Sequence, residues 1–292
     1  MTLESQLKAG IRAFDVRCRL VNNECAVYHQ FVSQEINLDE VLQICESFLK
    51  MYPSEVVLLR VKDKENSPIN STQSFEDVFV GRYWNKYRTL LWQPKDIDLS
   101  LSPPIPIGDV RGKVVILQYF KSSRLYSLPF KHTETTQSHW TQFSRATLYL
   151  KWTIIREHLL KTNDSSSIYF DPGPFGLELS FYTNWISGGL TVEPFFVASG
   201  HIDWGTDGRR HTCYKEYSFM TEEDSKKVFP EFPRSPLKKN SLGLHYRNVY
   251  CEGTNIMTYE KLKAERFRFV GIIFADFPGC GLIQAIIDSV NH

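Results

Sequence analysis

The order of predicted strands and helices near the start of the chain is what most limits its fold. Residues 12–21 alternate apolar and polar side chains, as in a half-buried strand. Asn37 can cap a helix whose apolar residues recur at helical spacing until Tyr52-Pro53, and the apolar run Val56–Lys62 is typical of a buried strand. A strand, a helix and a second strand in this order predict a right-handed crossover in a parallel sheet.

The same alternation continues along the chain. We expect a helix over 2–9, a strand over 25–31, a short helix over 75–87, a strand over 113–119, a longer helix over 141–161, a strand over 167–170 followed by a Gly/Pro-rich loop, a strand over 268–276 and a last helix from Leu282. The stretch 200–254 has weak periodicity and is predicted to hold loops and one short helix. This order favours an α/β chain folded as a single domain over residues 1–292, as an irregular β/α barrel of the TIM type.

The charge balance excludes several classes of partner. The sequence has 34 Lys and Arg against 33 Asp and Glu, so no broad positive field would hold nucleic acid or an anionic bilayer. No uninterrupted apolar stretch approaches the length of about 20 residues that a membrane span needs. Six cysteines without a C-x-x-C pair are expected to be buried free thiols. As written, the sequence indicates a monomer that is cytoplasmic or peripheral to a membrane, and an upstream secretory segment would make it a secreted protein.

Five polar residues fall near the carboxyl ends of the predicted strands, where β/α barrels carry their active sites. They are Asp15, Arg17, His29, Lys62 and Asp276. Each alone has a structural explanation, such as an ion pair between Asp15 and Arg17 or a satisfied barrel histidine at position 29. An acid, a base and a guanidinium together suit phosphate-ester chemistry.

The segments that hold these residues resemble a known family. They are similar to the X domain of bacterial-type phosphatidylinositol-specific phospholipase C at Gly10–Arg17, Tyr28-His29, Tyr52–Glu55, Val61-Lys62 and, late in the chain, Val270–Phe277. The resemblance is dense over the first fifth of the chain and sparse but collinear to the end. It implies a barrel that cleaves the glycerol–phosphate bond of an inositol phospholipid at a membrane surface. In that cleavage the inositol 2-hydroxyl attacks phosphorus and displaces the glycerol oxygen, which gives a cyclic inositol phosphate and diacylglycerol.

The resemblance also implies roles for three residues of the first strands. Arg17 would hold the phosphate and stabilise its developing charge, a task that suits a forked and permanently charged donor. It would take the place of the calcium ion that animal relatives use, so neither a metal nor another cofactor is expected. His29 would be the general acid for the departing glycerol oxygen, oriented and kept charged by Asp15.

Three further residues receive roles in the same way. Lys62 would lie at the phosphate or inositol rim, and Asp276 would orient the general base. Trp140 could stack on a sugar ring, or equally lie in the core. The family's general base is a histidine upstream of the matched segment, and nothing before Met1 supplies it. We therefore expect an N-terminally incomplete barrel that is a poor catalyst by itself.

Two alternatives to the phosphodiesterase remain open. The absent histidine motivates a catalytically inactive barrel that binds a lipid headgroup or a protein partner. Around 117–120 and 138–140 the sequence differs from the family at positions that belong to its headgroup site. This difference motivates a related phosphodiesterase that acts on a glycosylated inositol anchor or on another headgroup.

Overall fold

Two compact units make up the chain. Unit 1 comprises Met1–Thr136 and Ser167–Phe181, and unit 2 comprises Gln137–Ser166 and Tyr182–His292. The computed structural model describes residues 1–29, 31–64, 68–94, 105–130, 135–139, 148–164, 169–173, 176–180, 182–188, 194–199, 212–216, 238–239, 245–250 and 253–289. The single domain expected over residues 1–292 stays a prediction.

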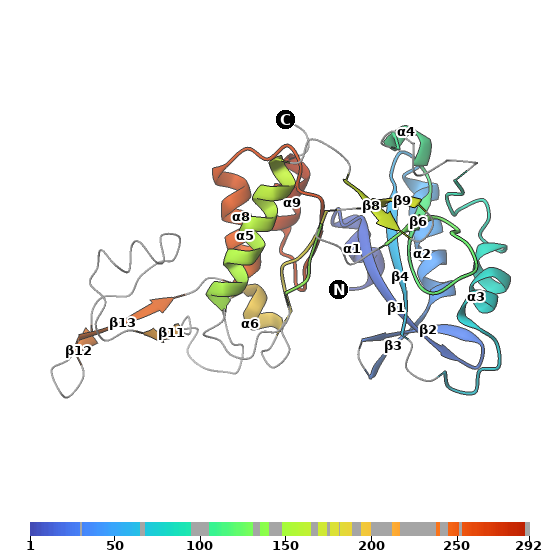
Figure 1. The fold of residues 1–292 in the computed structure, drawn as a ribbon, viewed down its shortest axis with the longest axis horizontal. Coiled ribbons are helices and arrows are strands. Elements are labelled where there is room, and N and C mark those ends of the chain that lie inside the picture. The colour runs from blue at the N-terminus through green and yellow to red at the C-terminus, as the bar shows by residue number, and fades with distance from the viewer. Residues whose placement is uncertain are drawn as a thin grey trace. The chain divides into compact units, whose positions relative to one another are not determined.

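Unit 1 holds the strands β1 to β6, β8 and β9, of which all but β5 are labelled in Figure 1. Its elements are α1 (Leu3–Lys8), β1 (Ala13–Val21), β2 (Glu24–His29), β3 (Val32–Asn37), α2 (Leu38–Met51), β4 (Val57–Asp63), α3 (Phe75–Val78), the π-helical segment η1 (Phe79–Trp84), α4 (Ile107–Val110), β5 (Val114–Tyr119), β6 (Leu128–Pro129), β8 (Tyr169–Gly173) and β9 (Gly176–Ser180). β8 and β9 form a separate antiparallel pair.

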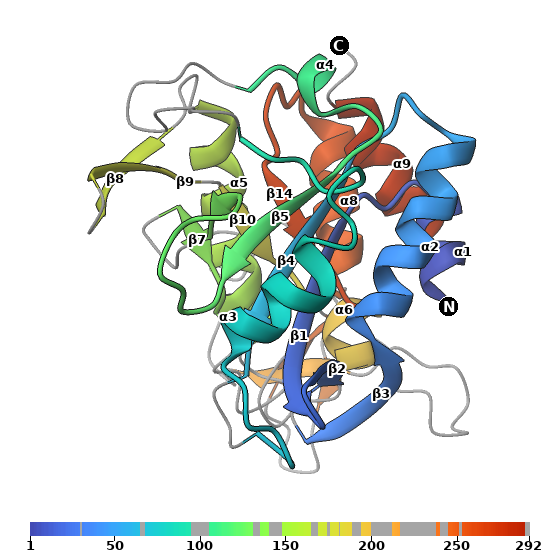
Figure 2. The same cartoon turned by 90° about the vertical axis from the view of Figure 1, so that its right-hand side faces the viewer.

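The main sheet of unit 1 has six strands in the order β3-β2-β1-β4-β5-β6. β1, β4, β5 and β6 are parallel, and β1, β4 and β5 run side by side in Figure 2, whereas β2 is antiparallel to both of its neighbours. The chain passes from β1 to β4 through the β2–β3 hairpin and α2. It therefore makes the crossover between parallel strands that the sequence predicts.

Local sequence explains where α2 begins and ends. The Asn37 side chain accepts a hydrogen bond from the Glu40 backbone, and the Glu40 carboxylate accepts one from the Asn37 backbone, which completes a capping box. The helix ends before Tyr52, ahead of Pro53, which cannot continue it. The predicted helix is confirmed at both ends.

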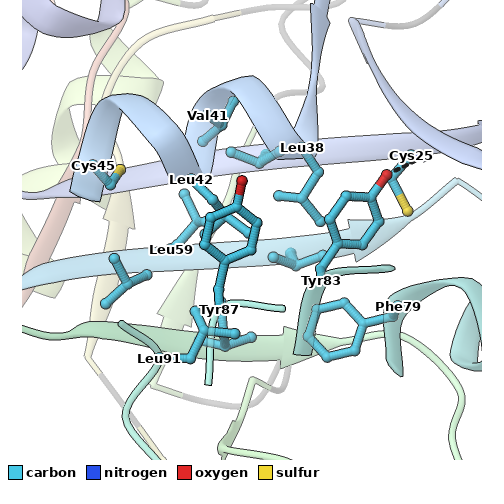
Figure 3. Close-up of a cluster of buried hydrophobic side chains, with 14 of the residues drawn as sticks. Cys25, Leu38, Val41, Leu42, Cys45, Leu59, Phe79, Tyr83, Tyr87 and Leu91 are labelled. Atoms are coloured by element: carbon cyan, nitrogen blue, oxygen red, sulfur yellow. Dashed lines mark hydrogen bonds between the residues drawn. The ribbon is translucent and has the colours of Figure 1, made fainter. Parts of the chain in front are cut away.

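The core of unit 1 lies between α2 and the sheet (Figure 3). Leu38, Val41, Leu42 and Cys45 of α2 and Leu59 of β4 are all buried there. The rings of Tyr83 and Tyr87 fill the same cluster, and the Tyr83 hydroxyl accepts a hydrogen bond from the Cys25 backbone. Burial raises the pKa of the Cys45 thiol to about 12. The expected buried free thiols are confirmed at positions 18, 25 and 45, whereas Cys280 is free and exposed.

Helices make up the larger part of the described residues of unit 2. Its elements are β7 (Thr136–Gln137) at the unit boundary, α5 (Leu148–Asp164), β10 (Thr183–Trp185), α6 (Pro194–Ser199), β11 (Thr212–Glu216), β12 (Lys238–Lys239), β13 (His245–Tyr250), α8 (Thr254–Ala264), β14 (Ile272–Phe274) and α9 (Cys280–Ser289). One sheet has the order β14-β10-β7, with β10 parallel to β14, and a second has the order β11-β13-β12. Trp152 and Ile155 of α5 pack in one core with residues of α8 and α9.

The α/β class is confirmed, with corrections to its details. Within the described residues, the strands form four separate sheets, and none of these closes into a cylinder. Within 200–254 the described residues include β11, β12 and β13, so the prediction of loops and one short helix is wrong for these three segments. Most of the rest of this stretch lies outside the described residues. The Gly/Pro-rich loop predicted after residue 170 is wrong as well, because β8 continues to Gly173 and β9 follows. The helix predicted over 75–87 begins as a single α-turn and continues as η1.

Loss of the α2 cap should weaken unit 1. We expect Asn37→Ala to lower the free energy of unfolding by about 1 kcal/mol, because the Glu40 backbone N–H loses its side-chain partner. Urea titration of the full chain measures this loss. Asn37→Ser keeps a capping oxygen and should retain most of the stability, so an equal loss in both variants would contradict the capping explanation.

Candidate active site

A polar face runs across β1 and β4 in unit 1. Phe14, Val16 and Cys18 are buried in the core, so alternation along the strand puts Asp15 and Arg17 on the opposite face. The parallel register sets Asp15 beside Arg60 of β4 and Arg17 beside Lys62. Sheet geometry therefore gathers one carboxylate and three cationic side chains from segments 45 residues apart.

Asp15 lies between two guanidinium groups. Arg17 donates from Nε to Asp15 Oδ2 at 2.9 Å, and Arg60 donates from Nη1 to Asp15 Oδ1. The Asp15 and Arg60 side chains are 14% and 2% exposed, so this ion pair is nearly removed from water, whereas Arg17 is 35% exposed. Breaking a buried pair leaves an uncompensated charge, so the three residues should act as one unit.

Arg60 is held by aromatic rings as well as by Asp15. Its Cζ lies 4.6 Å from the ring centroid of Tyr119 and 4.5 Å from that of Phe130. Burial lowers the pKa of Arg60, and the Asp15 carboxylate opposes this change. The sequence analysis missed Arg60 as a site residue. The signal was present, because a charged side chain inside an apolar strand needs a buried partner.

Arg17 is the guanidinium that a ligand can reach. Among the described residues, its hydrogen bond to Asp15 uses Nε and leaves both terminal NH₂ groups for a ligand. Lys62 lies beside it with Nζ 5.1 Å from the Tyr119 ring centroid. Burial lowers the pKa of Lys64, and the charges of Arg17 and Arg19 lower it further, so these cations lie close enough to repel one another. A bound anion would relieve that repulsion.

His29 lies at the exposed end of β2, on the strand next to β1. Within the part of the chain that the structure describes, it makes no hydrogen bond or ion pair with Asp15 or Arg17. Asp15 is instead bonded to Arg17 and Arg60, which matches the structural ion pair considered for Asp15 and Arg17. The expected orientation of His29 by Asp15 stays a prediction.

Asp276 belongs to unit 2, where it follows β14 and is exposed. A Cβ atom on Gly188 would lie 3.3 Å from Asp276 Oδ2, so the backbone of residue 188 passes close to the carboxylate. The convergence of Asp276 with Asp15, Arg17 and His29 stays a prediction. Trp140, predicted to contact substrate or fill the core, lies outside the described residues.

A buried lysine lies in the electrostatic field of Asp276. Lys151 of α5 is 1% exposed and donates from Nζ to the His139 carbonyl at 2.6 Å. Burial lowers the pKa of Lys151 to about 8, while the negative charge of Asp276 raises it. Burial and the charge of Lys151 together lower the pKa of His139. The sequence analysis gave no role to Lys151, because a lysine on a helix is usually solvated.

The described residues contain neither a candidate metal site nor a candidate membrane span. No group of three or more His, Cys, Asp or Glu side chains there could hold a metal ion. No helix in the same residues is both long and apolar enough to cross a membrane. The expected absence of a metal cofactor stays a prediction.

Comparison with known proteins points to one family. Residues 1–119 match the family described as phosphatidylinositol-specific phospholipase C, X domain. A 1-phosphatidylinositol phosphodiesterase of Listeria monocytogenes is 33% identical over 117 residues, which are 40% of this chain and 34% of that protein. One from Staphylococcus aureus is 28% identical over 115 residues, 38% of this chain and 35% of that protein. The chain thus spans about a third of the length of the curated relatives it matches.

Solved structures agree with this resemblance at the level of the fold. The phosphatidylinositol-specific phospholipase C of Listeria monocytogenes matches with a TM-score of 0.62 and 21% identity, over 99% of this chain and 82% of that chain. An S. aureus phosphatidylinositol-specific phospholipase C, from work on the modulation of its membrane binding, matches with a TM-score of 0.58 and 16% identity, over 97% and 82%. The resemblance to the X domain is confirmed, and the fold is that of these bacterial enzymes.

The shared carboxylate should appear as energetic coupling. We expect Arg60→Met to lower the free energy of unfolding by about 3 kcal/mol, because it leaves Asp15 partly buried with one partner fewer. The double variant with Asp15→Asn should lose less than the sum of the single variants, with a coupling of about 1–3 kcal/mol in urea titrations.

A matched cycle on an exposed ion pair provides the control. Arg82 and Glu24 are about half exposed, so the cycle of Arg82→Met and Glu24→Gln should give a coupling below about 0.5 kcal/mol. Equal coupling in the two cycles would contradict the special role of Asp15.

Lys151 should make stability depend on pH. Its pKa falls from 10.5 to about 8 on folding. Between these values the unfolded chain binds more protons, so this contribution to stability is complete above 10.5 and is lost as the pH falls through about 8. The full change is about 3 kcal/mol. Urea titrations at pH 7 to 10 should show wild type gaining stability relative to Lys151→Met, and parallel curves would contradict the prediction.

Proposed function

We propose, from the premise that residues 1–119 carry a phosphatidylinositol-specific phospholipase C X domain, that the chain is a phosphodiesterase that cleaves the glycerol–phosphate bond of an inositol phospholipid. The observation that carries the proposal is the Arg17 guanidinium, which Asp15 and the buried Arg60 hold on the β1–β4 face. A fixed, partly exposed cation beside further cations is what a phosphodiester requires of its binding site.

Arg17 would bind the phosphate and stabilise the charge that develops on it. Its Nε is already bonded to Asp15, so the side chain is oriented before substrate arrives and loses little freedom on binding. The two terminal nitrogens can then donate to two phosphate oxygens. Lys62 would add a second positive charge from the neighbouring strand.

His29 would protonate the departing glycerol oxygen. An imidazole at an exposed strand end can exchange protons with solvent between turnovers, and histidine is a common general acid in enzymes. Hydrogen bonds of a catalytic group often form only with bound substrate, so its separation from Asp15 does not exclude this role. Asp276 would orient the general base that takes the proton of the inositol 2-hydroxyl. In the family this base is a histidine upstream of the matched segment, which residues 1–292 do not include.

The exposed apolar tip of the β2–β3 hairpin favours a substrate that lies in a membrane. Phe31 and Val32, next to His29 at its tip, are 83% and 65% exposed, although apolar side chains usually avoid this exposure. The Lys64 ammonium lies 6.0 Å from the Phe31 ring centroid. An apolar tip with adjacent positive charge suits the surface of an anionic bilayer.

A second candidate function is headgroup binding without cleavage. It is favoured by the bonding of Asp15 to two guanidiniums, while His29 contacts no carboxylate in the described residues. Such a protein would need the cationic face but would not need a positioned proton donor. Variants of Arg17 and His29 therefore separate the two functions.

The full chain should release cyclic inositol phosphate from phosphatidylinositol vesicles, with chelator present. We expect Arg17→Ala and Arg17→Lys to lower kcat by about 10²–10³, because the forked donor is lost. His29→Ala should lower kcat by about 10²–10⁴ and leave flotation with the vesicles unchanged. Phosphate-ester release is followed by ³¹P NMR.

Arg82→Ala provides the control for positive charge, since Arg82 lies in an exposed ion pair with Glu24. It should change neither flotation nor release. Vesicle binding that depends on Arg17 without any release would favour the headgroup-binding protein. If the Arg17 and His29 variants all kept wild-type activity, the proposed roles of these two residues would be rejected.

A further inference from the structure

The loop after β14 holds an unusual backbone conformation beside Asp276. Phe277 has a φ of 50°, in the left-handed region, although it is not a glycine. This conformation costs a side-chain-bearing residue about 1–2 kcal/mol. Phe277 is 61% exposed, and its ring makes an edge-on contact with Phe195, at 5.5 Å between centroids. Packing of the ring is therefore too slight to explain why the backbone stays in this state.

Asn255 supplies the interactions that hold this loop. Its Nδ2 donates to the carbonyl of Asp276 at 2.8 Å and to that of Phe277 at 3.2 Å. Its Oδ1 accepts from the Ser187 hydroxyl at 2.7 Å. Two carbonyl acceptors require the amide NH₂ on one side, and the hydroxyl donor completes the other side, so the amide orientation is unambiguous. One side chain thus links α8, the end of β10 and the Asp276 loop.

The position of Asn255 is itself fixed by the packing of α6 against α8. A Cβ atom on Gly253 would lie 2.1 Å from the Ala198 carbonyl oxygen, so only glycine allows this approach. Thr254 donates from Oγ1 to the Val197 carbonyl at 3.0 Å. Asn255 is only 6% exposed. A side chain so tightly placed can hold a loop without losing much freedom of its own.

The segment after β10 also lies close to the Asp276 carboxylate. Gly188 follows Ser187 with a φ of 92°, and its missing Cβ leaves room for Asp276 Oδ2. The Ser187 hydroxyl also lies 3.4 Å from the Asp276 carbonyl oxygen. The Ser187-Gly188 segment and Asn255 therefore determine together where the carboxylate can point.

We propose that Asn255 is a positioning residue for Asp276. By holding the carbonyls of Asp276 and Phe277, it keeps the loop in its left-handed conformation and so aims the Asp276 carboxylate. The inference rests on the proposed function only for the role of Asp276 in catalysis. The geometric effect of Asn255 on the loop is independent of that function.

The first experiment therefore measures geometry. Crystal structures of wild type and Asn255→Ala are compared at Asp276 and Phe277. We expect Phe277 to leave the left-handed region and the Asp276 carboxylate to move away from Gly188. An unchanged loop in Asn255→Ala would overturn the proposal, whether or not the chain cleaves phospholipid, and an inactive wild type would reject the proposed function alone.

The second experiment measures catalysis on phosphatidylinositol vesicles. Asn255→Ala should lower kcat 10- to 100-fold with KM within twofold of wild type, because the carboxylate is misaimed while the binding face is intact. In an Asp276→Asn background the same substitution should have an effect below threefold, because Asn255 acts through Asp276. Additive losses, or a rise in KM alone, would overturn the proposal.

Two further variants separate positioning from general stability. Asn163 also holds backbone near β14, since its Oδ1 accepts from the Arg268 amide at 2.6 Å, but it does not touch the Asp276 loop. Asn163→Ala should therefore keep wild-type kcat. Ser187→Ala keeps both hydrogen bonds that Asn255 donates to the loop and should lower kcat two- to fivefold. This variant provides a test if Asn255→Ala does not fold. Equal losses in Asn163→Ala and Ser187→Ala would overturn the proposal.

Discussion

The carboxylate of Asp15 is the point on which the polar face of unit 1 depends. It joins β1 to β4 through Arg60 and orients Arg17 on its own strand. Without it, a nearly buried guanidinium that lies against the rings of Tyr119 and Phe130 would lose the negative charge bonded to it. The same contact that makes this part of the sheet stable therefore also prepares a cation for an anionic ligand. The ion pairs of Asp15 are therefore part of the stable sheet and part of the candidate site at the same time.

Local signals in the sequence were sufficient where a single element specifies itself. Asn37 and Glu40 predict the start of α2, and the apolar run from Val56 predicts β4. The strands β11 and β13 carry no such signal. Charged and polar residues such as Lys215, Glu216 and Arg247 interrupt any apolar alternation, so pairing between distant segments defines these strands.

Site residues followed the same division. Asp15, Arg17 and Lys62 could be assigned to one face because strand periodicity and a parallel register place them there. Arg60 was missed because its partners come from three strands or loops that only the fold brings together. Asn255 was missed for a similar reason, since an asparagine in the first turn of a helix gives no indication that it binds carbonyls 21 residues away. Short-range patterns identify elements, whereas long-range contacts identify the supports of a site.

The approach of α8 to α6 has a consequence for how this protein can evolve. The Ala198 carbonyl lies so close to residue 253 that a Cβ atom would not fit there, whereas the hydrogen atom of glycine does. The exposed side of α8 can accept many substitutions, but any side chain at position 253 would force the two helices apart and displace everything that the first turn of α8 carries. In a lineage that retains this loop, glycine should persist at that position while its surroundings diverge.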